Sequence, residues 1–271
     1  MIAEIRFKNM FSFRDEAILS FEADRSKDME SYHVVELGGD VRLLKVAVIY
    51  GANASGKSNI IKVCDFIKSF ITYTPLNKAE QIQIVPFLLN KTSSRQLSEY
   101  SISFYLKNEE KAVRYVYSVA LDRWHVAKEG LIYYPSQQPA TIFERNTENN
   151  VSVIKFGQKI KMSQSVKEEI TLKCLHNMSV FAAYMQVNVF FFAHCDVTSR
   201  HLKQAVLCPS DTFSVTGTQL LHLSSAYLHL GAKAQPLNFS YRTGGLPGML
   251  FILFSVSLSL GLLSRSAFVY G

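Results

Sequence analysis

Two short stretches near the start of the chain alternate between apolar and polar residues. Ile5 and Phe7 alternate with charged neighbours, and residues 17–21 read Ala-Ile-Leu-Ser-Phe. Alternation with a period of two is typical of β-strands, so we expect a hairpin whose turn lies near residues 9–12. The polar residues 23–40, which end in Gly-Gly-Asp, predict a loop.

An apolar run follows and leads into a helical pattern. Residues 43–50 (Leu-Leu-Lys-Val-Ala-Val-Ile-Tyr) are nearly all apolar, which predicts a strand buried on both faces. Beyond a glycine-rich segment, apolar residues recur every three or four positions, and this spacing predicts an amphipathic helix closed by Thr74 and Pro75. The apolar stripe of this helix comprises Ile60, Val63, Cys64, Ile67, Phe70 and Ile71.

Between residues 99 and 157 the period changes back to two. Five alternating runs joined by short polar connectors predict an antiparallel meander that packs beside the first sheet. The runs are residues 100–106, 113–119, 130–134, 140–144 and 151–156. Residues 163–176 then predict a helix capped by Ser163 or Ser165.

The composition changes near Val189. The first 169 residues contain 14 glutamates and the rest of the chain contains none. Residues 246–263 are almost all apolar or serine, a length just sufficient to span a bilayer. Three interpretations of residues 189–271 follow: a non-native terminus from a shifted reading frame, a membrane anchor diluted by serine and glycine, or a buried hairpin. We favour the first, expect irregular or helical structure in this tail, and base no function on it.

The overall composition is that of a folded chain. With 48% hydrophobic and 19% charged residues it can bury a sizeable core. The net charge of +7 suits a polyanion, but no run of Lys and Arg occurs, so nucleic acid is only weakly indicated. No two of the four cysteines have CxxC spacing, which favours reduced thiols over a zinc site. A charged fourth residue without an apolar run argues against a secretion signal, and we expect a cytoplasmic protein.

The glycine-rich segment matches the pattern G-x-x-x-x-G-K-[ST]. Glycines let the backbone turn tightly and approach a ligand, and amides at the start of the following helix point toward anionic oxygens. The preceding strand and the following helix supply the context that a phosphate-binding loop requires. An ordinary Gly-Ser turn has no need for an adjacent Lys and Ser. The predicted ATP-binding residues are Gly51, Ala52, Asn53, Ala54, Ser55, Gly56, Lys57, Ser58 and Asn59.

Lys57 and Ser58 carry the expected chemistry of this loop. The Lys57 ammonium is expected between the β- and γ-phosphates of a nucleoside triphosphate. The Ser58 hydroxyl is expected to coordinate Mg²⁺, which bridges the same phosphates. The sequence therefore predicts a site for ATP and Mg²⁺.

These residues resemble ABC-class ATPases of the SMC/RecF-like type, in particular the AAA-type ATP-binding proteins of bacterial phage-defence and abortive-infection systems. The resemblance covers residues 1–188. It rests on residues 5–13 (Ile-Arg-Phe-Lys-Asn-Met-Phe-Ser-Phe), 51–60 and 84–89. It implies that the early turn lies close to the nucleotide, with Asn9, Ser12 and Arg14 on the base or ribose side. A plain hairpin turn with its two phenylalanines in the core is an alternative for those aromatic residues.

Several motifs of such ATPases have no clear match in this sequence. No Leu-Ser-x-Gly signature occurs, since residues 223–226 read Leu-Ser-Ser-Ala, and no switch histidine is identified. The best match to a strand ending in Asp-Glu stops at Asp122, where Arg123 follows in place of the glutamate that polarises water. Asp122 is therefore a poor candidate for a metal ligand, and residues 190–196 are poorer. We expect nucleotide binding with weak or lost turnover.

The expected fold class is α/β, a P-loop NTPase lobe with an antiparallel β-meander subdomain. We expect a nucleotide-binding core (residues 1–98), a β subdomain with following helices (99–188) and the atypical tail (189–271). The resemblance implies a homodimer of ATP-bound heads, with DNA and a nuclease or other effector as partners, and membrane contact only if the tail is genuine. Alternatives are another P-loop protein, such as a small kinase or GTPase-like module, and an inactive truncated product.

Overall fold

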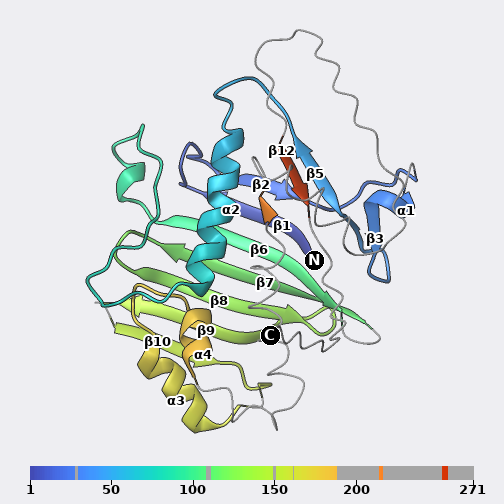
Figure 1. The fold of residues 1–271 in the computed structure, drawn as a ribbon. Coiled ribbons are helices and arrows are strands. Elements are labelled where there is room, and N and C mark those ends of the chain that lie inside the picture. Colours follow the sequence, from blue (N-terminus) through green and yellow to red (C-terminus); the bar gives the residue numbers. More distant parts are fainter. Residues whose placement is uncertain are drawn as a thin grey trace, which may run out of the picture.

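A seven-stranded antiparallel sheet forms the centre of the fold in the computed structural model of the chain (Figure 1). The structure describes residues 1–27, 30–107, 111–148, 151–160 and 162–187, together with the backbone of residues 214–215 and 252–255. The strands lie in the order β10-β9-β8-β7-β6-β1-β2. Their bounds are β1 (Ile2–Lys8), β2 (Ala17–Ser20), β6 (Ser98–Lys107), β7 (Ala112–Leu121), β8 (Val126–Tyr134), β9 (Ala140–Glu148) and β10 (Val151–Phe156).

The N-terminal hairpin and the meander share this one sheet. β1 pairs with β2 through Phe7 and Ala17, and with β6 through Ile5 and Ile102. The predicted hairpin and the five predicted meander strands are therefore confirmed. The proposed domain boundary after residue 98 stays a prediction, although β1 and β6 are hydrogen-bonded across it.

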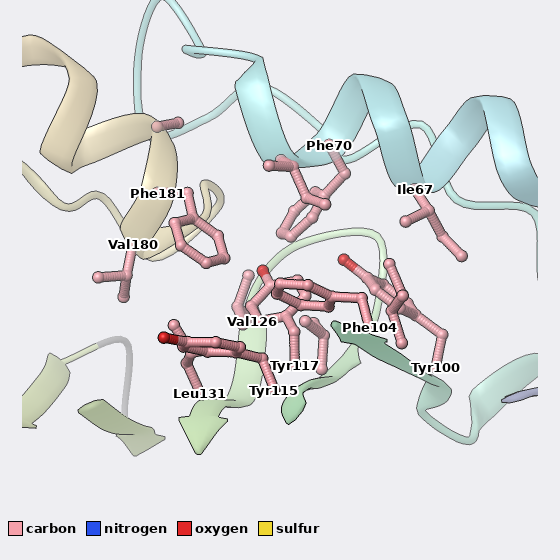
Figure 2. Packing of buried hydrophobic residues seen from close by; sticks show 14 of the residues in the cluster. Ile67, Phe70, Tyr100, Phe104, Tyr115, Tyr117, Val126, Leu131, Val180 and Phe181 are labelled. Atoms are coloured by element: carbon pink, nitrogen blue, oxygen red, sulfur yellow. The ribbon is translucent and has the colours of Figure 1, made fainter. Parts of the chain in front are cut away.

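Helix α2 (Lys57–Thr72) lies across one face of the sheet (Figure 1). Its predicted apolar stripe is confirmed, because Ile60 is partly buried and the other five residues are buried. Aromatic side chains of β6 and β7 meet the helix from below, among them Tyr100 and Tyr117, whose ring centroids are 6.1 Å apart (Figure 2). Each large side chain buried in this way contributes about 1.5–3 kcal/mol. The core therefore fixes the helix that begins at the glycine-rich loop.

The segment between the first hairpin and the glycine-rich loop is more structured than its sequence predicts. Residues 23–40, predicted to be a loop, contain α1 (Glu30–His33) and β3 (Val34–Glu36). The apolar run that follows is divided between β4 (Arg42–Leu44), which pairs with β3, and β5 (Val46–Ile49). These elements are too short to produce a recognisable period in the sequence.

The prediction that the apolar run is buried on both faces is wrong. Ala47 and Ile49 of β5 pack against the core, whereas Val48 on the opposite face is 48% exposed. Tyr50, which follows the strand, is exposed as well. An apolar run predicts double burial only where layers cover both sides of the strand, and the described core contacts one side of β5.

The expectation of irregular or helical structure in the tail is wrong for its described residues. These form β11 (Ser214–Val215) and β12 (Ile252–Ser255), and β12 pairs antiparallel with β5. Ile and Phe favour strands, and β5 offers backbone N–H and C=O groups for pairing. The three interpretations of the tail otherwise lie outside the described residues. Among the described residues, no helix combines the length and apolar character needed to cross a bilayer.

Two further helices follow the meander. The predicted helix at residues 163–176 is confirmed over α3 (Gln164–Lys173), where Ser163 occupies the N-cap position without a capping hydrogen bond from its side chain. The next helix, α4 (Val180–Gln186), begins after Ser179, whose hydroxyl accepts a hydrogen bond from the Ala182 amide. α4 is two turns long, too short for its period to be recognised in the sequence.

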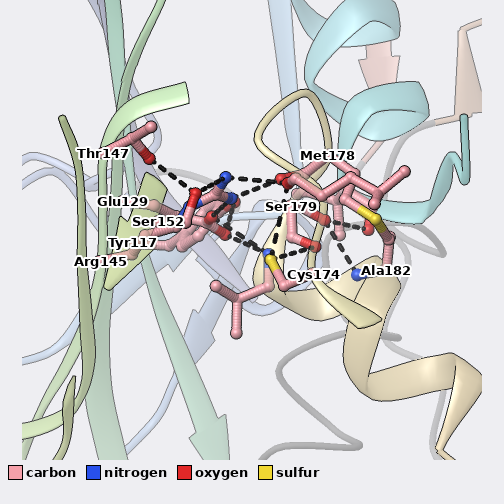
Figure 3. A network of polar contacts seen from close by, with 12 residues as sticks. Tyr117, Glu129, Arg145, Thr147, Ser152, Cys174, Met178, Ser179 and Ala182 are labelled. Carbon is pink, nitrogen blue, oxygen red and sulfur yellow. Dashed lines mark hydrogen bonds and ion pairs between the residues drawn. The ribbon is translucent and has the colours of Figure 1, made fainter. Parts of the chain in front are cut away.

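A buried ion pair joins the sheet to the start of α4 (Figure 3). Arg145 Nη1 lies 3.2 Å from Glu129 Oε2, and both side chains are fully buried. Glu129 also accepts hydrogen bonds from the Tyr117 hydroxyl (2.8 Å) and the Val180 amide (2.9 Å). Burial raises the pKa of the Glu129 carboxyl, and the nearby Arg145 charge opposes that shift.

The same contacts extend to α2. Arg145 donates to the carbonyls of Met178 and Leu175, which holds the chain just before α4. The Ser179 hydroxyl donates to the carbonyl of Ile71 at a distance of 2.9 Å. Because Ile71 lies in the last turn of α2, the polar cluster connects the sheet with the far end of that helix.

Two of the cysteines expected to be reduced are described. Cys64 on α2 and Cys174 after α3 are both free and buried. Burial raises the pKa of each thiol to about 12. Thiols of this kind stay protonated and unreactive near neutral pH.

Candidate functional site

The glycine-rich loop is a curled surface loop at the start of α2. Ala54 and Gly56 have left-handed backbone conformations, with φ of 61° and 94°. Left-handed residues within a turn direct successive N–H groups into a shared concavity, which is the arrangement that binds anions. Gly51 has an ordinary backbone, but a Cβ there would lie 3.1 Å from Ser55 Oγ, so a side chain would crowd the loop.

The predicted loop residues divide by exposure. Residues 52–55 and Ser58 are exposed, whereas Gly51, Gly56 and Asn59 are partly buried. No side chain caps the N-terminus of α2, and the Asn59 amide bonds back to the Gly56 carbonyl at 2.9 Å. An exposed helix start without a side-chain cap presents amides and the positive end of the helix dipole to a ligand.

Lys57 is folded into its own loop. Its side chain is buried, and Nζ donates to the carbonyls of Gly51 (2.8 Å) and Ala52 (2.7 Å). The ammonium therefore lies inside the curl of the loop, held by carbonyl oxygens. A phosphate group entering the loop would offer stronger, charged acceptors in the same place.

The N-terminal turn contacts the loop, as the predicted proximity of this turn to the nucleotide requires. A Cβ built on Gly56 would lie 3.3 Å from Ser12 Oγ and 3.4 Å from the Phe13 ring. Ser12 is exposed and therefore accessible beside the loop. Phe13 is partly buried, with its ring edge-on to Phe7 at 4.9 Å, which fits the alternative that the aromatics of the turn join the core.

Asn9 does not face the site, contrary to the base- or ribose-side role suggested for it. Its side chain is 2% exposed, and Nδ2 donates to the carbonyls of Ser93 (2.8 Å) and Gln96 (3.0 Å). Its Oδ1 accepts a hydrogen bond from the Phe87 amide at 3.1 Å. A buried amide with partners at both ends fastens the turn to residues 87–97, so Asn9 supports the site without lining it.

Arg14 is exposed at the end of the same turn. Its guanidinium pairs with the carboxylate of Asp15 at 3.0 Å and lowers the pKa of that carboxyl. An exposed pair of this kind is weak, so Arg14 is available to exchange Asp15 for another anion.

Asp122 is a turn residue whose carboxylate is engaged by neighbouring amides. Its Oδ1 accepts hydrogen bonds from the amides of Trp124 (2.7 Å) and His125 (2.8 Å) in the connection between β7 and β8. The described residues contain no group of three or more His, Cys, Asp or Glu side chains that could hold a metal ion. Residues 190–196 and 223–226 lie outside the described residues.

Replacing Gly56 by alanine tests the contact between turn and loop. We expect the free energy of unfolding to fall by about 1–2 kcal/mol from left-handed strain, and further because the new Cβ meets Ser12 and Phe13. Gly38→Ala is the matched control, since Gly38 has a φ of 96° but no neighbour within 4 Å of its Cβ position. Chemical denaturation measures both, and equal losses would contradict a tight contact at Gly56.

The glycine-rich loop lies within a segment that matches a known protein family. Residues 46–151 match the model of a family described as AAA domain, putative AbiEii toxin, Type IV TA system. The match covers less than half of the chain and includes β5, the glycine-rich loop, α2 and the strands up to β9. No curated protein and no solved structure matches the chain. The match supports an AAA-type, nucleotide-binding ATPase domain of the defence class.

Proposed function

We propose that the chain binds Mg-ATP through residues 51–58. The observation that carries this proposal is the exposed, curled loop, which has left-handed Ala54 and Gly56 and leads into an uncapped helix with Lys57 folded inside. Backbone amides, a helix dipole and one ammonium then converge on one small volume. That combination fits the terminal phosphates of a nucleoside triphosphate.

Different residues of the loop contact different parts of the proposed ligand. Lys57 exchanges the carbonyls of Gly51 and Ala52 for phosphate oxygens, and the loop amides donate hydrogen bonds to the remaining phosphate oxygens. Ser58 is exposed at the first turn of α2 and supplies a hydroxyl to the metal. When bound, Mg²⁺ would neutralise part of the triphosphate charge. Ser12 and Arg14 contribute on the side of the base or ribose.

We further propose that the chain acts in the manner of SMC/RecF-like ABC-class ATPases. Their hydrolysis takes place between two ATP-bound heads, so the proposed assembly is a homodimer with a nuclease or other effector in phage defence. The resemblance of residues 5–13 and 51–60 and the match to a toxin–antitoxin family support this setting.

Turnover by the isolated chain is expected to be weak. The sequence has no match to a strand ending in Asp-Glu, since Arg123 follows Asp122, and the Asp122 carboxylate is engaged within its own turn. Steady-state ATPase measurements on the pure protein test this. Robust turnover that Lys57→Ala abolishes would contradict it, whereas slow turnover with intact nucleotide binding supports it.

A further inference from the structure

A second concave site lies at residues 84–98, a segment that the N-terminal turn contacts. It is a depression of about 230 Å³ between the β7–β8 connection and residues 84–98. Arg123 and Trp124 line one wall, and Arg95, at the end of the short helix η1 (Ser93–Arg95), lines the other. All three side chains are exposed, and Trp124 is the only tryptophan of the chain.

The β7–β8 connection is built to present Arg123 and Trp124 outward. Asp122 accepts hydrogen bonds from the amides of Trp124 and His125, and its carboxylate also lies 3.0 Å from His125 Nδ1. The Arg123 carbonyl accepts from the Ile82 amide at 2.8 Å, which fixes the connection against the neighbouring segment. The backbone is thereby held rigid while the indole stays 57% exposed. A large exposed aromatic ring on a rigid turn is a stacking platform.

The charge around this platform is positive. Neither Arg95 nor Arg123 forms an ion pair with another described residue. Asp122 is the one acidic residue that lines the depression, and its turn already engages its carboxylate. An anionic ligand with a flat ring complements this surface.

We propose that the depression binds a nucleotide unit of a single-stranded nucleic acid. The base stacks on the Trp124 indole, and Arg95 and Arg123 contact the flanking phosphates. Stacking on aromatic rings combined with cationic contacts to the backbone is the general mode of binding single strands without sequence preference. The net charge of +7 favours the approach of such a polyanion.

The depression and the phosphate loop share one supporting element. The Asn9 amide donates to the carbonyls of Ser93 and Gln96 beside the depression. The Phe11 amide donates to the Val85 carbonyl at 2.8 Å. The next residues of the same turn, Ser12 and Phe13, contact Gly56. A nucleotide bound in the loop and a nucleic-acid strand bound in the depression would therefore both affect the same N-terminal turn. This coupling between the two sites rests on the proposed binding of ATP, whereas binding of nucleic acid in the depression does not.

Trp124 fluorescence measures the binding directly. A short oligothymidylate is expected to quench the emission of the full chain, with a weaker effect of thymidine monophosphate because the second phosphate contact is missing. Arg95→Ala and Arg123→Ala should each reduce the slope of log affinity against log salt concentration by about 0.7, the value for one phosphate contact to a single strand. Lys155→Ala, which removes an exposed lysine of β10, is the matched control and should leave the affinity for the oligonucleotide almost unchanged.

The variants that lack Trp124 are measured through the fluorescence anisotropy of a labelled oligonucleotide. Trp124→Ala is expected to weaken binding about tenfold, and Trp124→Phe to restore most of it. Absence of binding, equal binding of polyglutamate, or insensitivity to both arginine variants would overturn the proposal. A change in oligonucleotide affinity on addition of Mg-ATP tests only the coupling between the two sites. If the chain fails to bind ATP, the oligonucleotide should still quench the Trp124 emission.

Discussion

Replacing Lys57 by alanine is expected to weaken Mg-ATP binding by about 3 kcal/mol, or roughly 100-fold. The ammonium already lies inside the loop, where the carbonyls of Gly51 and Ala52 hold it. Two charge-assisted hydrogen bonds to phosphate oxygens are lost with it, and no neighbouring cation replaces them among residues 51–59. Titration with a fluorescent ATP analogue measures the change.

Lys62→Ala is the matched control for this variant. Lys62 lies on the same helix and is exposed, so its removal changes the net charge equally without touching the loop. We expect its affinity for the analogue to stay within about twofold of the parent, as for an exposed charge. Equal losses in the two variants would show that net charge, and not the position of Lys57, governs binding.

Replacing Arg145 by methionine is expected to lower the free energy of unfolding by about 3–5 kcal/mol. The substitution leaves the Glu129 carboxylate fully buried without its cation and removes the donors to the Met178 and Leu175 carbonyls. The start of α4 and its link to α2 through Ser179 depend on this cluster. Chemical denaturation measures the loss.

Arg114→Met provides the control on the same sheet. Arg114 is exposed on β7, where it donates to Ser103 Oγ and lies over the Tyr134 ring at 5.4 Å. Its removal should cost at most about 1 kcal/mol. The double variant of Glu129→Gln with Arg145→Met should recover part of the loss, because no unpaired charge remains. A loss from Arg145→Met no larger than that from Arg114→Met would contradict a structural role of the pair.

The elements with a clear period could be predicted from the sequence. Both the helix from Ile60 to Ile71 and the strands of the meander turn their apolar side chains toward one core. This requirement gives each element a local period that the sequence shows. The buried ion pair of Glu129 and Arg145 is harder to recognise in the sequence. Glu129 and Arg145 are direct cross-strand partners, but each lies one residue outside the runs predicted at residues 130–134 and 140–144, so the predicted strands did not include the pair.

Other features depend on distant contacts that local patterns do not contain. The double burial predicted for residues 43–50 fails because the number of covering layers is a property of the whole fold. The role of Asn9 depends on residues 87–97, which are far away in the sequence. The pattern of the glycine-rich loop predicts a tight turn, and Gly56 has a left-handed conformation there. The phosphate-binding role of Lys57 stays a prediction. The depression at Trp124 has no pattern, since its walls come from separate segments.

Isothermal titration calorimetry of the folded chain with ATP, with and without Mg²⁺, tests the central claim most directly. The structure of the loop predicts saturable uptake of one ATP per chain that is strengthened by Mg²⁺ and lost in Lys57→Ala. A folded protein that takes up no ATP at any Mg²⁺ concentration would contradict the account.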